Sequence, residues 1–135
     1  MMQQARFFLS TVGTDLDLYV ADHEDAAVSL DELKKFLWIL FMLTGKRAVI
    51  YSGHVLKEQI GSTKDKELAR HRLWLAHYTK SAPTWPKTTW PEWWLWQYTE
   101  QGTCAGFNGN VDLNRYDGTA DQLRADWIGA AAPVA

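Results

Sequence analysis

The sequence predicts an α/β fold in which parallel β/α units change into a strand-rich end. Short apolar strands alternate with helical segments over the first half of the chain, which is typical of parallel β/α units. The last three predicted strands then follow one another without clear helices between them. With 135 residues the chain has the size of one domain or of part of one, so residues 1–135 are assigned to a single domain.

Terminal signals mark the predicted helices. Residues 3–12 have the pattern of a helix, and Gly13 occupies the position where helices usually end. Ser29 and Glu32 have the spacing of a capping box, which predicts a helix that begins after Ser29 and runs to Thr44. The remaining helices are predicted over residues 54–60 and 63–71 and over a short stretch after Gly118.

Five short runs of apolar or alternating character predict strands. They lie at residues 16–22, 48–51, 73–78, 93–98 and 110–114. Residues 79–92 contain Pro83, Pro86 and Pro91 and therefore predict a loop. Residues 99–109 contain glycines and predict a connection between the last two strands.

Charge and composition argue against several partners. The chain has 14 Lys and Arg against 16 Asp and Glu, a net charge of −2, so neither nucleic acid nor an anionic membrane is expected as a partner. The longest apolar run, residues 36–43, is well short of the ~20 residues that span a bilayer. The first residues do not have the pattern of a signal peptide, and localisation stays open. The single cysteine, Cys104, permits neither an intramolecular disulfide nor a cysteine metal cluster.

Aromatic residues are unusually frequent, with eight Trp, five Tyr and five Phe. Trp74 and Tyr78 share one face of their predicted strand, and Trp96 and Tyr98 share one face of theirs. Aromatic rings pack well on the C–H faces of sugars, so these strands suit a carbohydrate cleft. Core packing is the alternative for each of these residues.

An acidic cluster follows the first predicted strand. Side-chain alternation puts Asp22 and Glu24 on one face, with His23 on the other face in a structural position. Two such carboxyls suit glycoside hydrolysis, in which one donates a proton and the other stabilises developing positive charge. Taken alone, an acidic triplet more often marks a solvated turn.

Asp112 is a further candidate acid. Within the strand 110–114 its side chain points opposite to the apolar Val111 and Leu113, and Asn114 shares its face. A carboxylate on a buried face needs a partner or a function. The alternative is an acid on the solvent side of an edge strand.

Five segments, in order along the chain, resemble the glycoside hydrolases of family 25, the Chalaropsis-type lysozymes or N-acetylmuramidases. The segments are residues 22–24, 47–53, 73–78, 94–99 and 109–114. The resemblance implies an irregular TIM-like (β/α)5β3 barrel, of which this chain would cover about strands 4 to 8. It also implies cleavage of the β-1,4 bond between N-acetylmuramic acid and N-acetylglucosamine in peptidoglycan, with no metal and no cofactor.

The resemblance also implies roles for individual residues. Glu24 matches the proton-donating glutamate, and Asp22 matches the aspartate that orients the acetamido group of the substrate or stabilises the intermediate. Asp112 matches the acid on the last strand. The positions near the saccharide cleft are Tyr51, Trp74, Tyr78, Trp96 and Tyr98.

The chain departs from the family at its start. The family begins with a strand that carries D-V-S and a further aspartate, and nothing here matches it, because residues 3–13 resemble the helix before the fourth strand. The resemblance therefore implies an incomplete catalytic domain. It leaves as an alternative a truncated chain that is inactive or only binds cell walls.

An incomplete barrel is expected to expose apolar surfaces. The predicted strands 16–22 and 110–114 would be open edges, and the helix 30–44 is apolar on all sides between residues 36 and 43. We expect self-association through these surfaces, unless the C-terminal tail with Trp127 and Ile128 covers the helix. The family resemblance implies action on cell walls, either outside the cell or after release by a phage.

Overall fold

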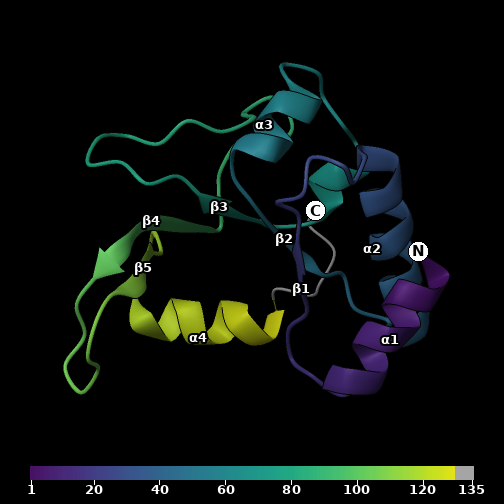
Figure 1. Ribbon diagram of the computed structural model, residues 1–135, viewed down its shortest axis with the longest axis horizontal. Coiled ribbons are helices and arrows are strands. Elements are labelled where there is room, and N and C mark those ends of the chain that lie inside the picture. The colour runs from purple at the N-terminus through teal and green to yellow at the C-terminus, as the bar shows by residue number, and fades with distance from the viewer. Residues whose placement is uncertain (130–135) are drawn as a thin grey trace.

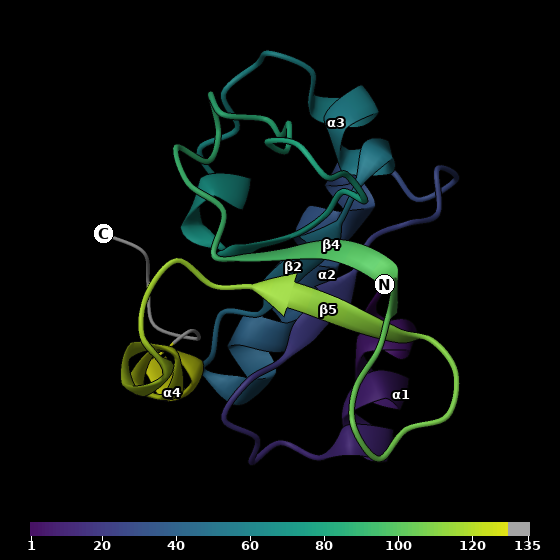
Figure 2. The ribbon, with the colours of Figure 1, turned by 90° about the vertical axis from the view of Figure 1, so that its left-hand side faces the viewer.

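The computed structural model describes residues 1–129, which form a five-stranded sheet with helices on both faces (Figure 1). The strands are β1 (Val20–Asp22), β2 (Val49–Ser52), β3 (Leu73–Ala76), β4 (Leu95–Gly102) and β5 (Val111–Arg115), in that order across the sheet. The first four run parallel, and β5 pairs antiparallel with β4 as a hairpin, seen at the front of Figure 2. The predicted change from parallel units to a strand-rich end is confirmed.

Four α-helices accompany the sheet in the described part of the chain. They are α1 (Met2–Val12), α2 (Leu30–Thr44), α3 (His54–Ile60) and α4 (Ala120–Gly129). Helices α1, α2 and α3 contribute to the larger hydrophobic core, whereas Leu123 of α4 packs against the smaller core on the other face of the sheet. None of the helices described over residues 1–129 is long and apolar enough to cross a membrane.

The two cores follow the alternation of the strands. Ile50 of β2 and Leu75 of β3 point toward the helices and are almost completely buried. Val49 and Leu95 point to the opposite face and form the smaller core with Trp94. Asp22 and Tyr51, near the carboxyl ends of β1 and β2, alternate onto the face of the smaller core, and the candidate site lies there.

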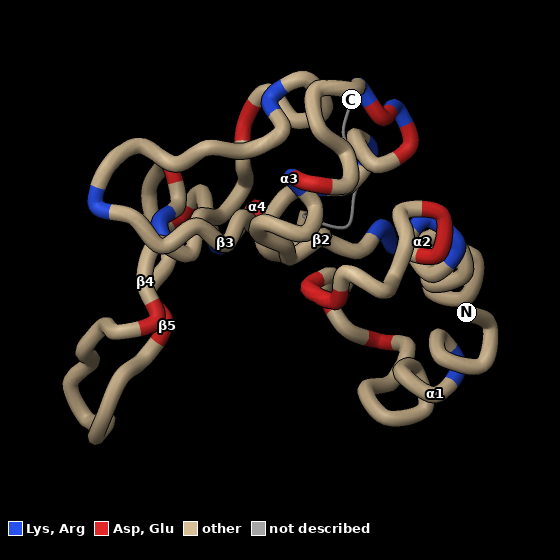
Figure 3. Tube along the Cα trace, turned by 45° about the horizontal axis from the view of Figure 1, so that its top comes forward, with Lys and Arg blue, Asp and Glu red and all other residues tan. Residues whose placement is uncertain are grey.

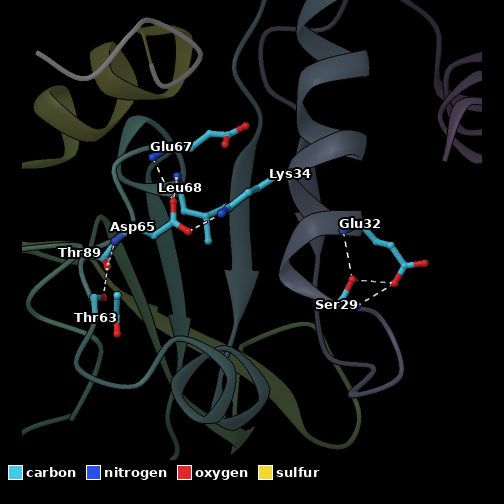
Figure 4. Close-up of polar contacts among 8 residues, drawn as sticks. All are labelled: Ser29, Glu32, Lys34, Thr63, Asp65, Glu67, Leu68 and Thr89. Carbon is cyan, nitrogen blue, oxygen red and sulfur yellow. Dashed lines mark hydrogen bonds and ion pairs between the residues drawn. The ribbon is translucent and has the colours of Figure 1, made fainter.

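The capping box at the start of α2 is confirmed in atomic detail. The backbone N–H of Glu32 donates to Ser29 Oγ at 3.3 Å, and the backbone N–H of Ser29 donates to Glu32 Oε2 at 2.9 Å (Figure 4). These hydrogen bonds hold the pKa of Glu32 below its usual value. The helix ends at Gly45, whose φ of 72° lies in the left-handed region that favours glycine.

Replacing Ser29 with alanine is expected to lower the free energy of unfolding by about 1 kcal/mol, because one N-terminal N–H of α2 loses its acceptor. Urea unfolding followed by circular dichroism measures the change. Ser62→Ala is the matched control, since Ser62 is exposed and forms no side-chain hydrogen bond in the described structure. An equal loss in both variants would contradict a contribution from the cap.

The predicted helix 63–71 is wrong, because only a short 3-10 turn, Leu68–Arg70, forms there. The carboxylate of Asp65 accepts the backbone N–H groups of Glu67 and Leu68, both at 3.0 Å, and thereby fixes a turn in place of a helix (Figure 4). The same carboxylate pairs with Lys34 of α2 at 2.6 Å. Burial opposes ionisation of Asp65, but the hydrogen bonds from Leu68 and Lys34 outweigh it and lower its pKa.

Candidate active site

The carboxyl ends of the parallel strands bring three of the predicted site residues to one face. Asp22 is the last residue of β1 and lies beside Tyr51 of β2, which in turn lies beside Trp74 of β3. Neighbouring positions in register project from the same face of a sheet. Trp74 pairs with Leu95, so Gln97, two residues further along β4, projects to this face as well.

Hydrogen bonds and one aromatic contact link residues of β2, β3, β4 and β5 with Tyr78, which follows β3. The hydroxyl groups of Tyr51 and Tyr78 both donate to Gln97 Oε1, at 2.6 and 2.8 Å. The Trp74 ring stands edge-on to Tyr51 with 5.7 Å between the ring centroids, and its Nε1 donates to Asn114 Oδ1 at 2.7 Å. The network fixes the orientation of three aromatic side chains beside the acidic cluster.

Glu24 lies in the loop that follows β1 and has a perturbed carboxyl group. Glu24 and Asp22 are both exposed, as a solvated turn would be, yet the limited burial of Glu24 and the negative charge of Asp22 raise the pKa of Glu24, whereas the charge of His54 lowers it. A raised pKa keeps the carboxyl protonated to a higher pH, which is the requirement for a general acid. His54 begins α3, and its approach to Glu24 could not be read from residue spacing.

The acidic residues nearby affect the pKa values of Tyr51 and Tyr78. Burial raises the pKa of Tyr51 and also that of Tyr78. Further upward contributions come from the charges of Asp22, Glu24, Glu100 and Asp112. Figure 3 shows acidic positions after β1 and again on the β4–β5 hairpin. Asp22, Glu24 and Asp112 therefore all act on the tyrosine pair.

Trp96 and Tyr98 lie on the other face of β4. The Trp96 side chain is buried in the larger core, and its Nε1 donates to the carbonyl oxygen of His77 at 2.8 Å. The Tyr98 ring packs against Trp96 with 5.9 Å between the ring centroids. The structure therefore separates these two residues from Tyr51 and Trp74, whereas Tyr78 lines one cavity together with them.

Buried groups behind the strand ends fix the acidic loop. His23 is buried as predicted, and its Nε2 lies 2.7 Å from Gln59 Oε1. Ser52 Oγ donates to the carbonyl oxygen of His23. A Cβ at Gly53, the residue after β2, would lie 2.7 Å from the carbonyl oxygen of Ala76, so only glycine fits between the end of β2 and the end of β3.

Gln97 is the residue that the sequence analysis missed. It is buried, and its carboxamide oxygen accepts both tyrosine hydroxyls. A polar amide between Trp96 and Tyr98 in a predicted strand was the available signal, because buried polar groups need hydrogen-bond partners. Over residues 1–129 no group of three or more His, Cys, Asp or Glu residues is arranged to hold a metal ion.

Sequence comparison identifies relatives of this chain. The model for glycosyl hydrolases family 25 matches residues 1–107. The uncharacterized protein YegX of Escherichia coli O157:H7 is 33% identical over 129 residues, which cover 90% of this chain and 45% of YegX. Lysozyme M1 of Streptomyces globisporus is 42% identical over 57 residues, or 42% of this chain and 19% of that protein. The chain thus spans about half the length of YegX, and the aligned segment spans about a fifth of Lysozyme M1.

Structural comparison agrees with this relationship. The bacterial lysozyme from Streptomyces coelicolor superposes with a TM-score of 0.76 and 26% identity, covering 96% of this chain and 67% of that one. The family GH25 lysozyme from Aspergillus fumigatus shares the fold with a TM-score of 0.67 and 23% identity, over 90% of this chain and 64% of that one. From its sequence match and its fold, the chain belongs to glycosyl hydrolases family 25.

Proposed function

We propose that this chain is a lysozyme that hydrolyses the β-1,4 bond between N-acetylmuramic acid and N-acetylglucosamine in peptidoglycan. The observation that carries the proposal is the position of Asp22 and Glu24 at the carboxyl end of β1, beside the strand positions of Tyr51 and Trp74 and the Tyr78 hydroxyl that bonds to Gln97. Membership of family 25 supports it, as do the lysozymes among the related proteins.

In this proposal the three acids have different roles in the reaction. Glu24 donates its proton to the glycosidic oxygen, and the carboxylate of Asp22 orients the acetamido group or stabilises the positive charge that develops on the sugar. Asp112 would supply a third acid; its side chain is exposed on the edge strand β5, and its charge raises the pKa of Tyr78. The reaction needs only these carboxyl groups and water.

The aromatic residues hold the sugar chain. The rings of Tyr51 and Trp74 are held at a fixed angle to each other and offer flat surfaces to the C–H faces of a sugar. Tyr78 is 48% exposed, so its ring is available to a ligand although its hydroxyl is bonded to Gln97. Beyond Tyr78 the substrate would meet Tyr98, whose ring is supported from behind by the buried Trp96.

A suspension of purified peptidoglycan tests the proposal directly. The purified chain is expected to clear the suspension and to release fragments with N-acetylmuramic acid at the new reducing end. Binding to the insoluble polymer without release of fragments would assign the chain a binding role only. The absence of both binding and clearing would overturn the proposal.

We also propose that copies of this chain associate through α2 and the edge strand β1. Trp38 and Met42 lie one turn apart on α2 and are 57% and 60% exposed. Trp127 of α4 packs on Trp94, on the opposite side of the sheet, and so does not cover α2. β1 is the edge strand of the sheet, because it pairs only with β2 among the described strands.

Sedimentation equilibrium is expected to give a mass that rises above that of one chain as the concentration increases. Replacing Trp38 and Met42 together with lysine should weaken the association roughly tenfold, because two charges would enter an apolar contact. Phe107→Lys is the matched control, since Phe107 is 69% exposed but lies in the β4–β5 connection. A single-chain mass at every concentration would contradict self-association.

A further inference from the structure

A second cavity adjoins the candidate active site. It has a volume of about 980 Å³ and opens between the loop after β3 and the second half of β4. Figure 1 shows this long loop extending away from the helices, above β4 in that view. Tyr78 lines the cavity and also donates its hydroxyl hydrogen to Gln97, so the cavity and the candidate site share this side chain.

Aromatic rings form the wall of this cavity. Trp93 and Tyr98 both pack against Trp96, each with 5.9 Å between the ring centroids. Trp93 and Tyr98 are only partly buried, so their free ring surface faces the cavity. Such a wall favours aliphatic groups and other apolar parts of a ligand.

The charges around the cavity favour an anion. Lys80 comes from the loop and Arg115 from β5, where its guanidinium lies 5.5 Å from the centre of the Trp96 ring. Within residues 1–129 neither cation forms an ion pair, and Glu100 is the only carboxylate in the lining. Two cations against one carboxylate leave a net positive charge, and a guanidinium suits a ligand carboxylate.

We propose that this cavity binds the peptide branch of the polymer whose sugar chain lies in the active site. The inference rests on the proposed function. Peptidoglycan carries short peptides on alternate sugars, and these peptides have both apolar side chains and free carboxylates. The aromatic wall would receive the apolar groups, while Lys80 and Arg115 pair with the carboxylates. A further neutral sugar would leave both cations without a partner.

The size and position of the cavity agree with this occupant. A volume of about 980 Å³ lies at the upper end of the range for ligand sites, which suits a peptide of a few residues. Tyr78 lies beyond the end of β3, lines the cavity and is bonded to Gln97 of the candidate site, so a branch can leave a sugar in the active site and reach the cavity around the end of β3. Lys80 and Arg115 would thus recognise the substituent and not the bond that is cleaved.

The test compares two ligands by calorimetry. One is the disaccharide of N-acetylglucosamine and N-acetylmuramic acid with its peptide, and the other is the same disaccharide with the lactyl carboxyl amidated and no peptide. The double variant Lys80→Glu, Arg115→Glu is expected to bind the peptide-bearing ligand about tenfold more weakly, at roughly threefold for each exposed charge pair. Binding of the peptide-free ligand should change less than twofold.

Two further variants make the result specific. The single variant Lys80→Glu should weaken binding of the peptide-bearing ligand roughly threefold. Lys80 lies in an exposed loop, so this variant keeps the test valid if the double variant folds poorly. Lys66→Glu introduces the same charge change at an exposed residue outside this cavity and should leave the binding of both ligands unaltered.

The outcomes separate the inference from the proposed function. Equal binding of the two ligands to the unaltered chain, or equal weakening of both by the double variant, would overturn the inference and leave the lysozyme activity standing. Failure of the unaltered chain to bind either ligand would overturn the proposed function and the inference with it.

Discussion

Replacing Glu24 with glutamine is expected to lower the rate of peptidoglycan hydrolysis by about 10²- to 10⁴-fold, the usual contribution of a general acid. Glutamine has nearly the shape of a protonated glutamic acid but cannot give a proton to the leaving oxygen. Binding of the polymer should therefore stay within about twofold, while the turnover rate falls. Release of new reducing ends from purified peptidoglycan measures the rate.

The control for this variant is Glu58→Gln. Glu58 is exposed on α3 and forms no side-chain hydrogen bond or ion pair in the described structure, so the same chemical change there should leave hydrolysis unaltered. Loss of activity in both variants would point to an effect of net charge on attraction to the polymer. Full activity of Glu24→Gln would remove Glu24 from the mechanism.

The stability of the same variant offers an independent check. The pKa of Glu24 is raised in the folded chain, so the unfolded state ionises more readily, and the folded state loses stability as the pH rises through the ordinary pKa of a glutamate. Glu24→Gln removes this loss. Its melting temperature at pH 7 should equal or exceed that of the unaltered chain, so a loss of activity cannot be attributed to unfolding.

Local signals in the sequence predicted much of the fold. The spacing of Ser29 and Glu32 identified the start of α2, because a capping box involves only neighbouring residues along the chain. Alternation placed His23 opposite Asp22, and the buried contact of His23 with Gln59 agrees with it. Such inferences succeed where the physical cause lies within a few residues.

Other features depend on contacts between distant segments. Alternation showed that Trp96 and Tyr98 share a face, but which face of the sheet it is depends on the helices that cover β4. The hydrogen bond from Tyr51 to Gln97 joins residues 46 positions apart, and no spacing rule predicts it. The expected helix 63–71 failed because the side chain of Asp65 competes for backbone N–H groups.

The largest effect after that of Glu24 is expected at Asp22. Asp22→Asn should lower the rate of hydrolysis about 10²-fold, because the variant loses a fixed negative charge beside a developing positive one. It should also lower the pKa of Glu24, since repulsion by Asp22 is one of the two causes that raise it, after burial. The two effects have separate measurements, the turnover rate and the pH profile.

The direction of the pH shift distinguishes this role from simple structural damage. A general acid works only while it is protonated, so activity falls as the pH rises through its pKa. This fall is the alkaline limb of the pH profile, and a lower pKa of Glu24 in Asp22→Asn moves the limb to lower pH. Replacing His54 with alanine removes the charge that lowers the pKa of Glu24 and should move the same limb to higher pH.

Asp25→Asn is the matched control for these two variants. The Asp25 carboxylate accepts the backbone N–H of Ala27 at 2.9 Å, which asparagine can also do, and Asp25 is not among the groups that shift the pKa of Glu24. The limb should therefore stay in place in this variant. Because a damaged fold has no reason to move the limb in opposite directions, opposite shifts in Asp22→Asn and His54→Ala require that the titrating group is Glu24. Shifts in the same direction would mean that another group sets the pH dependence.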